Sequence, residues 1–409
     1  MGGLETAFLL ACIFPYTQII PLGSYNQPYA LLFGGLLFLL RGPQTLAAMR
    51  PLDRWAVTGL FVAGVLLFSI IGVGNLTSQD LKYFLNYLTP FLLVPAAASI
   101  AYRNPDKLER ILRLGICAWA GVALVQQWYP NFLTFLVGSF SEASEASIES
   151  GRGVLGLAPE PTHHGFHMVV LAAAYAAVGS KRWPIILCLV DALLLARSAS
   201  VILSLAMGGL LWCCLSPRRL IIPAALGGGL LVFGIGFLAI SPSEDSRILS
   251  LVAMVLQNPG DLLLVDYSVN ARLGGMLAGL GHIFSEYMAP HGMSHADWLV
   301  ARVEMIRSTP WLIDISTVGI PSGFGVILYQ GGWLVAPMLA MIIYRLAGGH
   351  RLGWTGAIIV STIFVFLVLY YLASPDFSVL YGAMAARAMK AARTRPMSVY
   401  DGKLAGAAA

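Results

Sequence analysis

Residues 151–178 read GRGVLGLAPEPTHHGFHMVVLAAAYAAV. The first part of this stretch holds one Arg, one Glu, three His and two Pro, and the apolar run from Met168 to Val178 follows directly. Nothing comparable occurs elsewhere in the chain. Charged groups are expensive to desolvate at a membrane boundary, so a cluster there predicts a functional site. The stretch therefore predicts a membrane helix whose outer end carries an anion-binding, acid–base site.

The composition is that of a membrane protein. The chain has 409 residues, of which 58% are hydrophobic and 11% are charged. Soluble domains carry about 25% charged residues, so we expect one integral membrane domain over residues 1–409. All five Cys lie in apolar runs without metal-binding spacing, which argues against disulfides and zinc. Because no basic segment precedes residues 4–20, we expect a first membrane span there rather than a cleaved signal.

Apolar runs of about 17–25 residues predict transmembrane helices, and shorter runs are tolerated in a large bundle. The expected fold is an all-α polytopic integral membrane protein with about twelve spans. We expect them near 4–20, 28–41, 53–74, 83–101, 110–128, 163–179, 184–196, 199–215, 220–240, 322–345, 354–373 and 376–390. Proline residues at most of the breaks favour these divisions, since a helix does not easily continue through proline.

Charge predicts the orientation of these spans. If the first span starts inside, 18 of the 25 Lys and Arg residues fall on the inner side. The remaining seven are Lys82, Arg152, Arg197, Arg247, Arg272, Arg302 and Arg307. The positive-inside bias therefore predicts that both termini are cytoplasmic.

This orientation leaves two long outer loops, at 129–162 and 241–321, the second with amphipathic helical stretches broken by Pro and Gly. Six of the seven His fall on the outer side. The outer face is therefore the expected side for acid–base chemistry.

Arg152 and Glu160 are the first candidate site residues. Pro159 and Pro161 bracket Glu160, and Thr162 is expected to cap the following helix. Helix N-termini favour phosphate, and Arg binds phosphate oxygens in bidentate fashion. The alternative is an interfacial loop in which Arg152 and Glu160 only pair with each other. The adjacent His163 and His164 favour the functional interpretation.

Two further arginines are candidates for the same anion. Arg197 lies in a short turn between apolar runs, and Asp191 is an intramembrane acid six residues earlier. The alternative for Arg197 is a snorkelling side chain at a helix end. Arg272 lies on an amphipathic helical stretch that could bring it over the membrane mouth to meet Arg152. Its alternative is a solvated surface charge.

His291 and His295 lie in a loop rich in Gly and Ser, and His is the usual general base near neutral pH. Loop histidines are more often plain surface residues. A zinc site formed with Asp297 lacks any defining spacing, so no metal is expected.

Four segments, taken in order, resemble the O-antigen polymerase and ligase family (Wzy and WaaL type) of polysaccharide membrane glycosyltransferases. They are RGVLGLAPEPTHHG at 152–165, ARSAS at 196–200, SVNARLGGMLAGLG at 268–281 and GFGVILYQGGWLVAPMLAMIIYRL at 323–346. Each motif alone is degenerate, and the order and topology carry the resemblance over about residues 150–345.

The resemblance implies inverting glycosyl transfer without metal or other cofactor, with undecaprenyl diphosphate as leaving group. By position, Arg152 and Arg272 match the arginines that hold the diphosphate, and Arg197 is a weaker third. It also implies a bacterial inner-membrane location with a periplasmic site. The implied partners are the lipid-linked glycan, the bilayer and a chain-length regulator protein, with no nucleic acid.

Ligases of the family usually carry a His shortly before the span that resumes after the large loop. This chain has Pro321, Ser322 and Gly323 there, which favours the polymerase branch. The base is then expected among Glu160, His163, His164 and His291.

A ligase and a transporter or flippase of lipid-linked sugars remain as alternatives. Transporters place coupling charges at the membrane midplane, often beside broken helices. Asp191 is the one acid expected well inside a span, which favours an enzyme.

Overall fold

The structure is a computed structural model that describes residues 2–19, 27–71, 76–137, 153–216, 264 and 269–393. Regular structure within these residues is helical, apart from an isolated antiparallel bridge between Thr17 and Val137. The expected all-α fold is therefore confirmed. The span expected near 220–240 lies outside the described residues.

The bundle is built from eleven of the described helices, and six further helical elements accompany them. They are α1 (Gly2–Ile13), α2 (Tyr29–Ala48), α3 (Pro51–Ser69), α4 (Ser78–Arg103), α5 (Pro105–Gln126), α7 (Pro161–Val178), α8 (Trp183–Val190), α9 (Ala199–Leu215), α16 (Gly323–Ala347), α17 (Thr355–Val368) and α18 (Pro375–Arg393). The other described elements are η2 (Thr134–Leu136), η3 (Asp191–Leu195), η5 (Asn270–Gly274), α14 (Gly275–Ser285), α15 (His295–Ser308) and η6 (Gly348–Leu352).

Four of the described helices are long and apolar enough to cross a membrane: α2, α3, α4 and the continuous helix Gly323–Leu352. These helices indicate a membrane protein, but the expected number of about twelve spans is wrong for the described residues. Helices α1, α8 with η3, α9 and α17 are apolar but short. At 1.5 Å per residue α1 reaches only about 18 Å, against about 30 Å for a bilayer core. Charged residues in α5 and α18, and three His in α7, lower the hydropathy of those helices.

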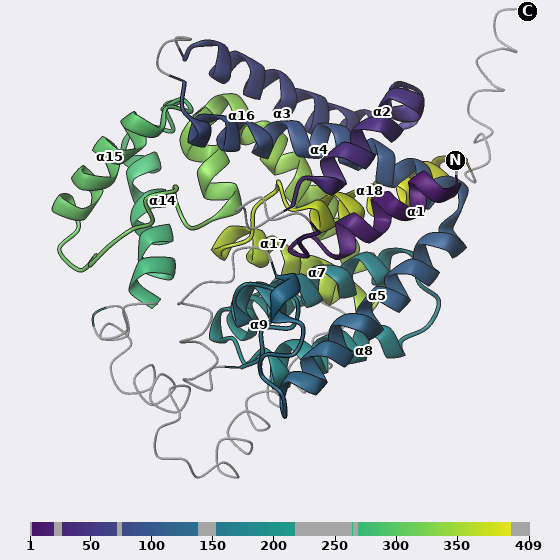
Figure 1. Cartoon of the computed structure of the whole chain (residues 1–409). Helices are drawn as coiled ribbons and strands as arrows, with labels where there is room; N and C mark the ends of the chain where they lie inside the picture. Colours follow the sequence, from purple (N-terminus) through teal and green to yellow (C-terminus); the bar gives the residue numbers. More distant parts are fainter. Residues whose placement is uncertain are drawn as a thin grey trace, which may run out of the picture.

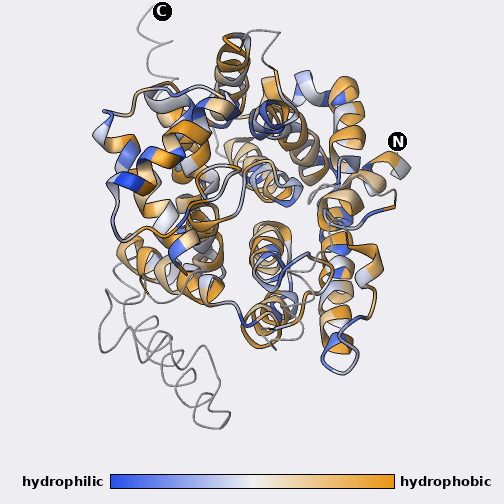
Figure 2. Cartoon of the chain, turned by 60° about the vertical axis from the view of Figure 1, so that its left-hand side comes forward, coloured by the Kyte–Doolittle hydropathy of each residue, from blue (hydrophilic) through white to orange (hydrophobic). Residues whose placement is uncertain are grey.

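Helices α7, α17 and α18 lie between two groups of helices, with α2, α3, α4 and α16 on one side and α5, α8 and α9 on the other (Figure 1). Most of α7 is buried, including every residue from Gly165 to Tyr175. Helices α5, α8, α17 and α18 pack around it. A Cβ on Gly382 of α18 would lie 2.7 Å from Ala97 of α4, so small residues allow this close approach. Most of the helical ribbon is coloured hydrophobic in Figure 2.

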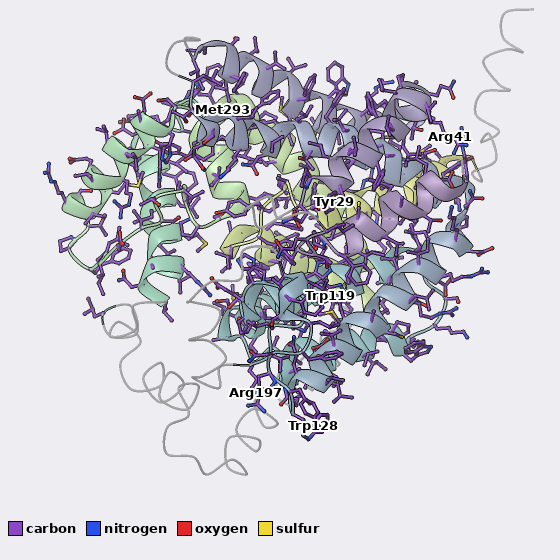
Figure 3. The ribbon with its side chains drawn as sticks, viewed as in Figure 1. Tyr29, Arg41, Trp119, Trp128, Arg197 and Met293 are labelled. Carbon is purple, nitrogen blue, oxygen red and sulfur yellow. The ribbon has the colours of Figure 1, made fainter. Side chains whose placement is uncertain are left out.

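The basic residues expected on the inner side gather at one end of the bundle. Arg41 of α2 and Lys107 of α5 both bind Glu5 of α1, at 2.8 and 3.0 Å. Arg345 at the end of α16 binds both carboxylate oxygens of Asp53 in the first turn of α3, at 2.6 and 2.5 Å. We call this end, defined by Arg41, Lys107, Arg345 and Lys390, the basic end. Figure 3 shows Arg41 far from Met293, which lies near α15 on the opposite side of the molecule.

Two helix boundaries lie in the interior rather than at the surface. Helix α1 ends at Ile13 shortly before Pro15, and Trp119 Nε1 donates to the Ile13 carbonyl at 2.9 Å. Helix α17 ends at Val368, and α18 begins at Pro375 with Asp376 fully buried. Polar backbone groups at these interior ends need partners from side chains.

The segment that carries α14 and α15 contacts the bundle at a kink in α16. Gly332 has φ +50°, and a Cβ there would lie 2.1 Å from the Met288 carbonyl oxygen. Trp333 N–H donates to that same oxygen at 2.9 Å. The connection between α14 and α15 therefore packs directly on α16, which fixes the position of η5 and α14.

Candidate functional site

Helix α7 begins earlier than expected. Pro161 occupies its first turn and Glu160 is its N-cap residue, without a side-chain capping bond. Thr162 is therefore not the cap, and that expectation is wrong. The fixed φ of proline favours the first helical position, where its missing N–H costs nothing. Thr162 and His163 consequently lie in the first turn of the helix.

Arg272 of η5 contacts this helix start directly. Its Nη2 donates to Glu160 Oε2 at 2.6 Å, and its Nη1 donates to Thr162 Oγ1 at 3.0 Å. Ser198, just before α9, donates to Thr162 Oγ1 at 3.2 Å. The Arg272 and Glu160 side chains are 27% and 26% exposed, so an anion from outside can reach them. We call Glu160, Thr162, His163, Ser198 and Arg272 the α7 N-terminal cluster.

Local packing holds Arg272 in place. Asn270 Nδ2 donates to the Trp311 carbonyl at 2.7 Å, and Asn270 Oδ1 accepts from Ile313 N–H at 2.8 Å. Gly275 fits against Ile315, at 3.1 Å from the position of a Cβ. The guanidinium is thus presented from a supported segment.

His163 is the member of the cluster that faces the interior. Glu160 and Arg272 are its charged neighbours. Its ring lies edge-on to Tyr16, with 6.1 Å between ring centroids, and 6.5 Å from the ring of Tyr370. His163 therefore lies between the charged pair Glu160 and Arg272 and the buried rings of Tyr16 and Tyr370.

His164 points in another direction, into a closed site. Its Nε2 lies 2.8 Å from Asp191 Oδ1, and both side chains are buried. Gln126 bonds both the N–H and the carbonyl of Gly156, which covers the His164 ring. Within the described part of the chain, His164 Nδ1 and Asp191 Oδ2 have no hydrogen-bond partner. Asp191 therefore pairs with His164 and not with Arg197.

We expect Gly156→Ala to destabilise the protein by about 2–4 kcal/mol, because it combines a left-handed backbone with overpacking. Gly156 has φ +59°, and a Cβ would lie 2.1 Å from His164 Nδ1. Chemical unfolding of the detergent-solubilised protein measures the loss. The control is Gly292→Ala, which has φ +82° but no atom within 4 Å of the Cβ. Equal losses in both variants would show that the methyl group added at position 156 does not clash with His164.

Arg197 directly precedes Ser198 of the cluster, but its side chain bonds back to its own turn. It is exposed, has φ +48°, and its Nε donates to the Leu194 carbonyl at 3.1 Å. Figure 3 shows it with Trp128 at the edge of the molecule, away from Trp119 at the centre. Its role in anion binding stays a prediction. Arg152 lies outside the described residues, so its expected meeting with Arg272 stays a prediction too.

His291 belongs to a separate group on α14 and α16. Its ring stacks on Tyr329 at 4.4 Å between centroids, and its N–H donates to the Tyr329 carbonyl at 3.2 Å. His282 lies 5.4 Å from His291, and burial together with this neighbour lowers the pKa of His282. His295 instead contacts Tyr83, at 3.0 Å from Nδ1 to the hydroxyl. Among the described residues, no three His, Cys, Asp or Glu side chains are grouped to hold a metal ion.

Sequence reasoning missed a second buried pair, His167 with Asp376. His167 Nδ1 lies 2.7 Å from Asp376 Oδ2, and both side chains are buried. Asp191 is thus not the one acid inside the bundle, and that expectation is wrong. The sequence Ser374-Pro375-Asp376 has the features of a helix start. The local sequence does not show that this helix start lies inside the bundle. The spacing of His163 and His167, which places both on one face of α7, was the available signal.

The chain matches no known family model. A search of curated proteins also gives no match.

The cluster has the parts of an anion site with an adjacent base. A helix N-terminus, a guanidinium and two hydroxyl groups lie together, and each is a group that binds phosphate oxygens. Glu160 neutralises Arg272 now, and an incoming anion would compete with it. A displaced Glu160 carboxylate, or the neighbouring His163, is then free to accept a proton.

Proposed function

We propose that the protein is a membrane glycosyltransferase that polymerises undecaprenyl-diphosphate-linked repeat units into a surface polysaccharide. The observation that carries this proposal is the contact of Arg272 with Glu160 and Thr162 at the start of α7. It joins two segments that the sequence places in separate outer loops, and both belong to the motifs of the O-antigen polymerase and ligase resemblance. No metal is needed for the roles assigned below.

In the proposed reaction the acceptor oxygen bonds to the anomeric carbon, and the bond from that carbon to the diphosphate oxygen breaks with inversion. Arg272 and the N–H groups of α7 stabilise the charge that develops on the departing diphosphate. Glu160, released from Arg272 by the diphosphate, takes the proton of the acceptor hydroxyl, with His163 as the second candidate base.

The placement in the membrane is part of this proposal. Exposed Trp and Tyr side chains are typical of membrane–water interfaces. Trp55 and Tyr344 are exposed near the basic end, and Trp128, Tyr129 and Tyr287 are exposed in other parts of the molecule. By the positive-inside rule the basic end faces the cytoplasm, which puts the α7 N-terminal cluster at the periplasmic face of the bacterial inner membrane.

A transporter or flippase of lipid-linked sugars is the second candidate. The buried His167–Asp376 pair beside the interior ends of α1 and α17 favours it, because transporters use buried charges at broken helices. An outer anion cluster would then bind the diphosphate without chemistry.

One reconstitution separates these functions. Purified protein in lipid vesicles is given undecaprenyl-diphosphate-linked repeat units alone, and products are resolved on a gel. We expect a ladder of polymer; a ligase gives none until an acceptor such as lipid A core is added. Unreacted substrate that has moved between leaflets, detected with a membrane-impermeant reagent, would instead identify a flippase and contradict the polymerase.

A further inference from the structure

The His167–Asp376 pair is fully satisfied in the middle of the bundle. Besides His167, Asp376 Oδ2 accepts from the Tyr370 hydroxyl at 2.7 Å. Asp376 Oδ1 accepts from Ser374 Oγ at 2.5 Å and from Phe377 N–H at 2.8 Å. Four donors on one buried carboxylate are a built polar site rather than a stray acid.

The hydrogen-bond geometry indicates how many protons this pair holds. His167 Nε2 lies 2.9 Å from the Ile13 carbonyl oxygen, which only accepts, so Nε2 carries a hydrogen. The 2.7 Å contact between Nδ1 and Asp376 Oδ2 also needs a hydrogen, on one atom or the other. The pair therefore holds one proton beyond a neutral ring and an ionised carboxylate, and its net charge is zero. Losing that proton would leave a buried negative charge, which is costly.

Two tyrosine hydroxyl groups lead from the pair towards the α7 N-terminal cluster. Tyr16 donates to the Tyr370 hydroxyl oxygen at 2.9 Å, and Tyr370 donates to Asp376. The Tyr16 ring lies 6.1 Å from His163 and 6.0 Å from His167. His163 and His167 are one helical turn apart, so both tyrosines lie beside the same face of α7.

We propose that the His167–Asp376 pair is a proton-binding site that exchanges with the outer face through Tyr370, Tyr16 and the side of His163. To refill the pair, the Tyr370 hydroxyl proton moves to Asp376 Oδ2 and the Tyr16 proton moves to the Tyr370 oxygen. The Tyr16 oxygen then takes a proton from water or from protonated His163. One proton enters, one is bound, and nothing is oxidised or reduced.

The surroundings suit a site that keeps its proton within the protein. Cys12 of α1 is a further titratable neighbour of Asp376, and the Trp119 ring of α5 lies 4.5 Å from that of His167. Both are buried, and the Tyr370 and Tyr16 hydroxyl groups lead from the pair towards the ring of His163. The proposal holds for an enzyme, where the site takes up a reaction proton, and equally for a transporter.

Nuclear magnetic resonance of the full chain in lipid nanodiscs, with ¹⁵N-labelled histidine, tests the proton count. The His167 signal is assigned by its loss in His167→Gln. We expect both ring nitrogens to be protonated, or one shared proton between Nδ1 and Asp376, at neutral pH. A ring with an unprotonated Nδ1 that senses no proton from Asp376 would overturn the proposal.

Hydrogen–deuterium exchange at the His167 ring tests the route. We expect exchange to slow by about tenfold or more in Tyr370→Phe, which keeps the ring but removes the hydroxyl. Tyr175→Phe is the control, because Tyr175 lies on α7 but bonds Glu109 at 2.9 Å near the far end of that helix. If Tyr370→Phe does not fold, Tyr16→Phe makes the same test. Unchanged exchange in the folded variant would overturn the route.

Discussion

Replacing Arg272 with Ala is expected to lower the rate of polymer formation by about 10²–10³-fold, the cost of removing a preorganised donor to a developing anion. The guanidinium reaches the start of α7 with two nitrogens, so Arg272→Lys should recover only part of the rate. Gel analysis of the products from lipid-linked repeat units, at equal amounts of protein in the membrane, measures both variants.

Arg307→Ala is the matched control for Arg272→Ala. Arg307 is an exposed arginine in the last turn of α15, in the same outer segment, so we expect polymer within about twofold of the unsubstituted protein. The Arg272–Glu160 pair is only about a quarter exposed, so its loss also costs some stability, and the two variants are compared at equal amounts of folded protein. Full activity of Arg272→Ala would refute the assigned role.

The local features of the site were predictable from the sequence. Pro159, Glu160 and Pro161 directly before an apolar run mark a helix start with charge beside it, and α7 begins there. The cap was misplaced by two residues because a proline at the first helical position extends the helix ahead of Thr162. The amphipathic segment around Arg272 also predicted a helical stretch, and η5 and α14 occupy it.

Long-range pairing was not predictable from the same pattern. His167 and Asp376 are 209 residues apart, and only packing of α7 against α18 brings them together. The hydropathy of a segment measures how apolar the segment is, but it does not show how deep in the bundle the ends of its helix lie. Asp376 therefore seemed to stand at a membrane boundary, whereas α18 begins inside the bundle. The same limit explains the span count, since short helices such as α1 and α17 have span-like composition without span-like length.

The largest effect on stability is expected at the basic end. Asp53→Ala should lower the free energy of unfolding by about 3–5 kcal/mol, because it leaves a largely buried arginine without its partner. Arg345 is 14% exposed and binds both oxygens of Asp53, which is fully buried. Tyr381 of α18 also donates to Asp53 Oδ1 at 3.3 Å, so the carboxylate joins three helices. Chemical unfolding in detergent measures the loss.

Asp106→Ala separates this effect from a general effect of acidic residues at helix starts. Asp106 also lies in the first turn of a helix, α5, but it is exposed, so its loss should cost no more than about 1 kcal/mol through the helix dipole. The double variant Asp53→Leu with Arg345→Leu should regain much of the stability, because neither charge then remains buried alone. If Asp53→Ala were as mild as Asp106→Ala, the close contact of α3, α16 and α18 would have to be wrong.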